Sequence, residues 1–131
     1  MNLINKPITL MINIFSRYKF IFYFLNFVLI FFYLFPGSIL GYFLYNDIKK
    51  QPQITPDFLI SSNHLYIFLF LSAVGFFTFR KVKLFKVLSI YLISLSIILE
   101  FLHLLVPERS FQWPDLFGNL IGVIIVIIIT F

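Results

Sequence analysis

Long apolar runs constrain the fold of this chain more than any other feature. They cover about residues 18–34, 64–79, 84–105 and 115–131, each near the roughly 20 residues that a helix needs to cross a bilayer core of about 30 Å. The chain is 61% hydrophobic and 11% charged, whereas soluble domains are about half apolar and a quarter charged. We therefore predict an all-α protein, a single domain over residues 1–131 that forms a four-helix transmembrane bundle.

The segments between these runs indicate where the helices end. Pro36-Gly37 ends the first run, because this dipeptide favours a turn. Ile39 to Tyr45 is apolar but too short to span, and its two tyrosines favour the membrane interface. Residues 46–63 are predicted to form a polar loop. The chain has no cysteine, which excludes a disulfide and a thiolate metal site.

Basic residues predict the orientation. They gather before the first run and between the second and third, at Arg80, Lys81, Lys83 and Lys86, and such segments stay in the cytoplasm. Both termini are therefore expected inside, in a multi-pass protein of the cytoplasmic membrane that contacts lipid. Because the net charge of +5 comes from residues beside the spans, we expect no nucleic-acid partner.

The same orientation places the main ionisable residues at the outer face, where loops 36–63 and 106–114 should lie. These residues are His64, Glu100, His103, Arg109 and Asp115. At 100° per residue, Ser89, Ser96, Glu100 and His103 share one stripe of the third helix, and Asp115, Asn119 and Gly122 share one on the fourth. Polar stripes in lipid face other helices, so we expect an outward-opening polar pocket. Asn26, midway along the first run, is expected to form a hydrogen bond inside the bundle.

These residue types suggest specific roles. Glu100 and His103, one turn apart, could form a general base or a proton relay, or only a structural polar pair. Arg109 carries a donor fork suited to phosphate or carboxylate, or pairs with Glu108 or lipid head groups. Asp115, after Pro114, is placed to cap the fourth helix.

We assign Glu100, His103 and Asp115 as candidate catalytic residues and Arg109, Asn119 and His64 as candidate ligand-binding residues. An ordinary position at the membrane–water interface would also account for the presence of His64. Imidazole and carboxylate groups suit zinc, but their separation along the chain matches no recognised ligand spacing. We therefore predict no metal and no cofactor.

The outer-face residues resemble the signature of the VanZ-like family of small bacterial membrane proteins. That signature has Glu with Gln three residues later, then Pro-x-Arg, then Asp-x-x-x-Asn-x-x-Gly leading a final helix. The matching segments are Glu100-Phe-Leu-His103, Pro107-Glu-Arg109 and Asp115 to Gly122, with Pro36-Gly37 and His64 also in place. His103 replaces the usual Gln, and the Asp-Lys pair that commonly precedes the second-helix His is absent. The resemblance implies a role at the outer face of the cytoplasmic membrane, in envelope or glycopeptide response.

Two functions follow as hypotheses. In the first, the outer pocket binds or processes an anionic envelope or lipid-linked molecule; Arg109 holds the anion, Glu100 and His103 handle a proton, and Asp115 and Asn119 orient them. In the second, the chain is a non-catalytic structural or assembly subunit whose polar residues fasten its helices. A transporter fits less well, since no broken helix is evident at mid-membrane. Whether the chain is an enzyme, and whether it forms an oligomer or joins a partner subunit, stay open.

Overall fold

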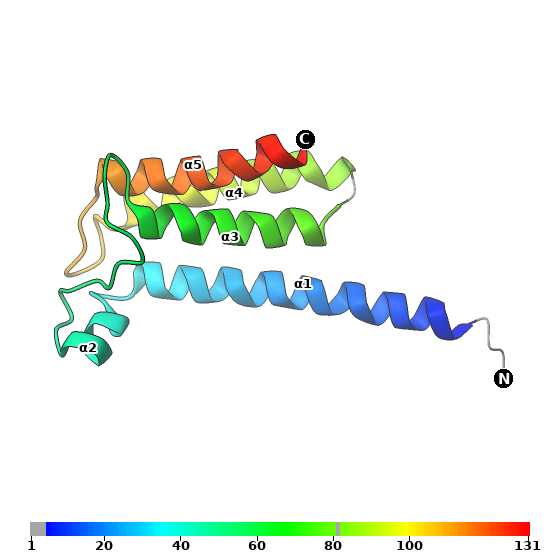
Figure 1. Cartoon of the computed structure of the whole chain (residues 1–131), viewed down its shortest axis with the longest axis horizontal. Helices are drawn as coiled ribbons and strands as arrows, with labels where there is room; N and C mark the ends of the chain where they lie inside the picture. Colours follow the sequence, from blue (N-terminus) through cyan, green and yellow to red (C-terminus); the bar gives the residue numbers. More distant parts are fainter. Residues whose placement is uncertain (1–4, 81) are drawn as a thin grey trace.

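The computed structural model describes residues 5–80 and 82–131, with side chains described for 17–80 and 83–131. This part of the chain is all-helical, without a β-strand. Its helices are α1 (Asn5–Leu34), α2 (Ile39–Tyr45), α3 (Ser62–Thr78), α4 (Val82–Leu102) and α5 (Trp113–Thr130). Figure 1 shows α1, α3, α4 and α5 running side by side, with the short α2 and the longer loops at one end.

The helices have the length and composition of membrane segments. Three contain an apolar stretch long enough to cross a bilayer, at Arg17–Leu34 in α1, Lys83–Leu102 in α4 and Trp113–Thr130 in α5, and α3 is a shorter apolar helix. Large apolar side chains face outward, such as Phe20, Phe27 and Ile128, which are 70%, 67% and 71% exposed. Such a surface is unfavourable in water but not in hydrocarbon, which indicates a membrane protein.

Several helix boundaries differ from the predictions. The third helix ends at Leu102 instead of Leu105, because the chain from His103 to Val106 closes into tight turns, with the Leu105 N–H donating to Leu102 O at 2.9 Å. The first helix begins at Asn5, although its apolar span begins only at Arg17. Polarity alone does not stop a helix, since lysine and asparagine are tolerated within one.

The turn after α1 has a clear local cause. The residue before a proline is disfavoured in helical conformation, and α1 ends at Leu34, just before Phe35 and Pro36. Gly37 then takes φ +79°, a left-handed conformation that suits glycine. The predicted interfacial segment forms α2, whose N-cap Ser38 accepts a hydrogen bond from the Gly41 N–H at 2.9 Å.

The closest helix packing is between α3 and α5. A Cβ on Gly122 would lie 2.6 Å from Leu65 O, and one on Gly118 would lie 2.6 Å from Ser61 O. Small residues of this kind let helix backbones approach in a membrane. The fully buried core beside this contact comprises Phe68, Leu92 and Val123. The resulting α3–α5 contact fixes the relative height of His64 and Asp115.

The α3–α5 contact yields the first testable prediction. Gly122→Val should lower the free energy of unfolding by about 1–3 kcal/mol or more, because its side chain would overlap α3 backbone that cannot move aside. Thermal unfolding in detergent measures this change. Ala73→Val, which adds bulk at an exposed position of α3, is the matched control. Equal stability of Gly122→Val and wild type would contradict this packing.

Candidate functional site

Polar side chains from four helices meet at the end of the bundle that carries α2. The polar cluster comprises Tyr33 of α1, His64 of α3, Glu100 of α4, His103 just after α4, and Asp115 and Asn119 of α5. Glu100 and Asn119 are 0% exposed, and His103 is 2% exposed. In hydrocarbon, groups of this kind cost several kcal/mol each unless they have partners. Their partners therefore define the site.

Tyr33, His64 and Asn119 form the centre of the cluster. The Tyr33 hydroxyl donates to Asn119 Oδ1 at 2.6 Å. His64 Nδ1 lies 2.9 Å from that hydroxyl oxygen and 3.1 Å from Asn119 Oδ1. Asn119 Nδ2 donates to Ser96 O of α4 at 3.3 Å. A single asparagine therefore links α1, α3 and α4 to α5.

These contacts fix the tautomer of His64. The one hydroxyl proton of Tyr33 is used on Asn119, so both neighbours of His64 Nδ1 are acceptor oxygens. His64 Nδ1 must therefore carry a proton and donate it, which leaves a lone pair on Nε2 of the neutral ring. That nitrogen lies 3.4 Å from Asp115 Oδ2.

The same argument applies to His103. Its Nε2 lies 3.1 Å from the carbonyl oxygen of Tyr33, which can only accept, so Nε2 donates. The lone pair of the neutral ring is then on Nδ1, which lies 3.4 Å from Glu100 Oε2. The His103 ring also stacks on Tyr33, with centroids 5.4 Å apart. The predicted Glu100–His103 pair is therefore present in the structure.

Glu100 serves two neighbours unequally. Its Oε1 accepts a hydrogen bond from the Gln112 N–H, the N-cap of α5, at 2.9 Å. Its Oε2 is buried and has no hydrogen-bond partner among the described residues. Oε2 faces His103 Nδ1 at 3.4 Å and His64 Nδ1 at 4.0 Å. One oxygen thus anchors a helix end, and the other is directed into the cluster.

Asp115 does not take its expected role as the helix cap. The helix begins at Trp113 with Gln112 as N-cap, so Asp115 lies inside the first turn and faces His64. Pro114 is tolerated in the first turn of α5, because N–H groups in the first turn of a helix have no partner within the helix. The carboxylate oxygen that accepts from the N-cap N–H belongs to Glu100 instead.

Arg109 lies apart from the cluster, at the carboxyl end of α1. Its Nη2 donates to Gly37 O at 2.6 Å and to Phe32 O at 3.2 Å, and its Nε donates to Phe35 O at 3.3 Å. A cation at a helix carboxyl end is favourable and satisfies carbonyls that lack helix partners. Burial lowers the pKa of Arg109, while Tyr33, Asp115 and Glu100 act in the opposite direction. Arginine nonetheless stays protonated in proteins.

Side-chain contacts elsewhere test two further predictions from the sequence. Glu108 pairs with Lys49 at 3.5 Å, not with Arg109. Asn26 does form a hydrogen bond between helices, since Tyr91 of α4 donates to its Oδ1 at 2.8 Å, but this bond is exposed and not in the interior of the bundle as predicted.

A cleft of about 300 Å³ connects Arg109 to three residues of the cluster, Tyr33, His64 and His103. Side chains of α1 and α3 line its apolar part, including Leu25, Leu29, Phe32, Ile67 and Phe70. His64, His103 and Arg109 line its polar end together with Ser38 and Asn63. Such a site, mostly apolar with a few placed polar groups, is typical of small-molecule binding.

The structure therefore divides the predicted site residues into two sets. His64, His103 and Arg109 reach the cleft, whereas Glu100, Asp115 and Asn119 are not among its lining residues and stand behind the histidines. Sequence reasoning missed Tyr33, which is 6% exposed and joins both histidines. Its only signal was a hydroxyl near the end of an apolar run, three residues before Pro36.

Comparison with protein-family models, with curated proteins and with solved structures finds no match for this chain.

The central hydrogen bonds give a second testable prediction. Tyr33→Phe should lower the free energy of unfolding by about 1–3 kcal/mol, because the buried Asn119 loses its donor and His64 loses an acceptor. Thermal unfolding in detergent measures the loss. Tyr42→Phe, at an exposed position of α2, removes the same hydroxyl elsewhere and should change nothing. A stability of Tyr33→Phe equal to that of this control would contradict the assigned network.

Proposed function

We propose that this chain is a four-span protein of the VanZ-like type in the cytoplasmic membrane, with both termini in the cytoplasm. Its outward-facing pocket would bind or process an anionic, lipid-linked envelope molecule. The observation that carries the proposal is the cleft, which joins an apolar channel between α1 and α3 to a polar end containing Arg109 and two histidines.

The fourth span of this proposal is α3. It has 17 residues, at the lower end of the roughly 17–25 that cross a bilayer. It packs against α1, α4 and α5, so this short span has other helices as neighbours along its length. A water-exposed position for such an apolar helix is harder to explain.

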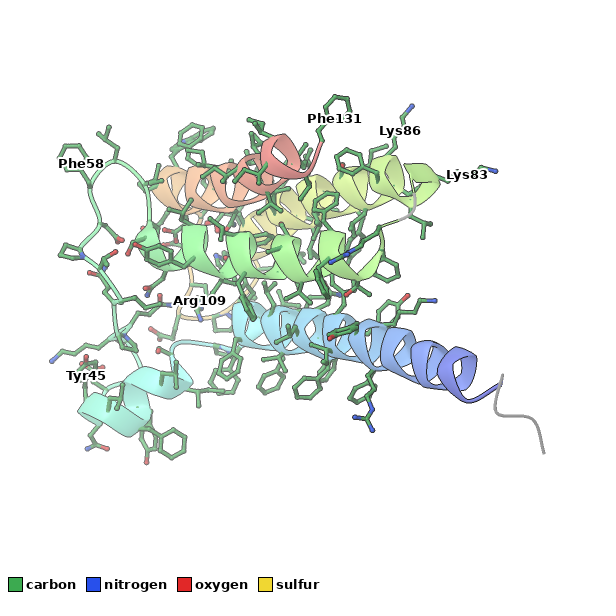
Figure 2. All side chains as sticks on the ribbon, turned by 45° about the vertical axis from the view of Figure 1, so that its right-hand side comes forward. Tyr45, Phe58, Lys83, Lys86, Arg109 and Phe131 are labelled. Carbon is green, nitrogen blue, oxygen red and sulfur yellow. The ribbon has the colours of Figure 1, made fainter. Side chains whose placement is uncertain are left out.

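The distribution of charge supports the orientation. Figure 2 shows Lys83 and Lys86 at the end of the bundle opposite Tyr45, Phe58 and Arg109. Basic residues near spans favour the cytoplasmic side, so the end with the polar cluster would face outward. This is also the side on which the family resemblance implies an envelope role linked to glycopeptide response.

The cleft suggests what the pocket would take. A hydrocarbon chain suits its apolar walls, and the positive charge of Arg109 at its polar end favours an anionic head group. Arg109 donates to the Phe32, Phe35 and Gly37 carbonyls through Nε and Nη2. Its Nη1 has no hydrogen-bond partner among the described residues, so the Nη1 donors would be available for that group. A lipid-linked anion would place its hydrocarbon chain and its head group in the cleft at the same time, so it would bind more tightly than a free anion.

Residue roles follow from position. His64, His103 and Arg109 would touch the bound molecule, and Asn119 and Asp115 would hold His64. If the molecule is processed, His103 and Glu100 form the pair that would share a proton taken from it, because Nδ1 and Oε2 face each other at 3.4 Å and would need only a small approach to form a hydrogen bond. Binding alone does not need this step.

A structural or assembly subunit is the alternative, and one observation favours it. The Tyr33–Asn119–His64 contacts fasten four helices together, which is a sufficient reason for buried polar residues. In that case substitutions in the cluster would lower stability and leave no binding activity to lose.

Cysteine labelling tests the orientation, because the native chain has no cysteine. Ser110→Cys, in the exposed loop before α5, should react with a membrane-impermeant maleimide in intact cells. Lys86→Cys should react only after the cells are permeabilised. Both positions are exposed, so a difference reports the side of the membrane. The reverse pattern would reject the proposed topology.

Binding of lipid-linked anions is tested with purified protein in detergent, using a polyprenyl phosphate and the uncharged polyprenol of the same length as probes. The phosphate should bind at least about tenfold more tightly, a difference of about 1.4 kcal/mol. Arg109→Gln should remove most of this preference, while Arg80→Gln at the opposite end should retain it.

Cleft-filling variants separate binding from stability. Val28→Trp places bulk on the cleft wall and should weaken both probes, whereas Phe27→Trp, on the exposed face of α1, should not. Melting temperatures are measured for every variant. Absence of saturable binding by folded wild-type protein would reject the pocket and favour the structural subunit.

A further inference from the structure

Three residues of the polar cluster have the chemistry and positions of metal ligands. One potential ligand atom from each of His64, Glu100 and Asp115 lies within 4.8 Å of the others. These residues come from α3, α4 and α5 and are separated widely along the chain. Their proximity is therefore a product of helix packing, above all of the α3–α5 contact.

The geometry points to a divalent metal site of the zinc class formed by His64, Glu100 and Asp115. Zinc accepts imidazole nitrogen and carboxylate oxygen at about 2.0–2.2 Å with tetrahedral geometry, so two of its ligands stand about 3.3–3.5 Å apart. His64 Nε2 and Asp115 Oδ2 are separated by 3.4 Å. The Glu100 ligand atom lies within 4.8 Å of the other two, and a shift of its side chain toward them would complete a set of three protein ligands.

The direction of the lone pairs supports a cation between these groups. His64 donates from Nδ1, so its Nε2 lone pair faces an oxygen of Asp115 at 3.4 Å. A lone pair and a carboxylate repel each other at this distance unless a cation or a proton lies between them. The Nδ1 lone pair of His103 faces Glu100 Oε2 in the same way, also at 3.4 Å.

The unsatisfied oxygen of Glu100 is an independent observation. Oε2 is buried, has no hydrogen-bond partner within the described chain, and is directed toward both histidines. A buried carboxylate without a partner is costly. A divalent cation would give this oxygen a partner and balance the two carboxylate charges.

The surroundings resemble those of a metal site. Metal-binding histidines usually donate their second ring N–H to a fixed acceptor, and His64 does so toward Asn119. The Glu100 carboxylate is held through Oε1 by the Gln112 N–H. The Asp115 side chain is 17% exposed, so one of the three ligands is accessible from the surface of the molecule. Three protein ligands would leave one position open, as in catalytic zinc sites.

This site lies behind the cleft and does not depend on the proposed lipid-linked molecule. Metal content is measured on the protein alone, so failure to bind a metal and failure to bind a polyprenyl phosphate are separate results.

The full chain, purified with a tag that lacks histidine, provides the test. Elemental analysis should find about one zinc-class ion per chain, and chelator-treated protein should bind Zn²⁺ or Co²⁺ saturably. Co²⁺ should give the visible absorption of a tetrahedral site with nitrogen and oxygen ligands. Zn²⁺ should also raise the melting temperature of the chelator-treated protein, because a ligand that binds only the folded state stabilises it.

Variants assign the ligands. Glu100→Gln, His64→Gln and Asp115→Asn should each lower bound metal at least tenfold, whereas Glu108→Gln, in the exposed loop outside the cluster, should not. Elution profile and helical circular dichroism check folding of each variant. Folded wild-type protein that contains no metal, binds neither ion saturably and shows no change in melting temperature would overturn the proposal and assign the facing lone pairs to protons.

Discussion

The need to partner polar groups beside hydrocarbon governs the organisation of this protein. Asn119 lies at the centre of that requirement: it accepts from Tyr33, lies opposite His64 Nδ1 and donates to the Ser96 carbonyl. Water cannot satisfy these groups at a buried position, so the helices must satisfy one another. The Gly122 and Gly118 contacts make this possible, because they bring α5 close enough to α3 for Asn119 and Asp115 to reach His64.

The loops at the same end obey a similar constraint. Arg109 lies more than seventy positions away in the sequence from the end of α1, and it donates to one carbonyl of the last turn of α1 and to two carbonyls just after it. Glu100 likewise stabilises the start of α5, because its Oε1 accepts a hydrogen bond from the Gln112 N–H. Each charged side chain thus stabilises a helix end and keeps atoms without a hydrogen-bond partner among the described residues, namely the Nη1 donors of Arg109 and Oε2 of Glu100. Structural and functional roles are combined in the same residues, so stability and binding must be measured together.

The proposed binding cleft and the proposed metal site share His64 but lie on different sides of it. His64 and His103 line the cleft, while Nε2 of His64 and Nδ1 of His103 face the carboxylates behind it. The Tyr33 ring lies between the two histidines, stacked on one and edge-on to the other. This arrangement lets a group bound in the cleft and a cation behind it influence each other through one imidazole.

The sequence by itself determined the helical class, the approximate spans, the turn at Pro36-Gly37 and the end of the bundle at which the polar residues gather, because length, hydropathy and helical period are local properties. It also determined the Glu100–His103 pair, since one turn of helix brings the two together. Only the tertiary structure decided that Tyr33 joins the cluster and that His64, Glu100 and Asp115 converge. It also decided that Arg109 binds the carbonyls at the end of α1, and that Glu100, not Asp115, accepts the hydrogen bond at the start of α5. These are contacts between helices, and they depend on rotation and height set by packing at Gly118 and Gly122, which no local pattern encodes.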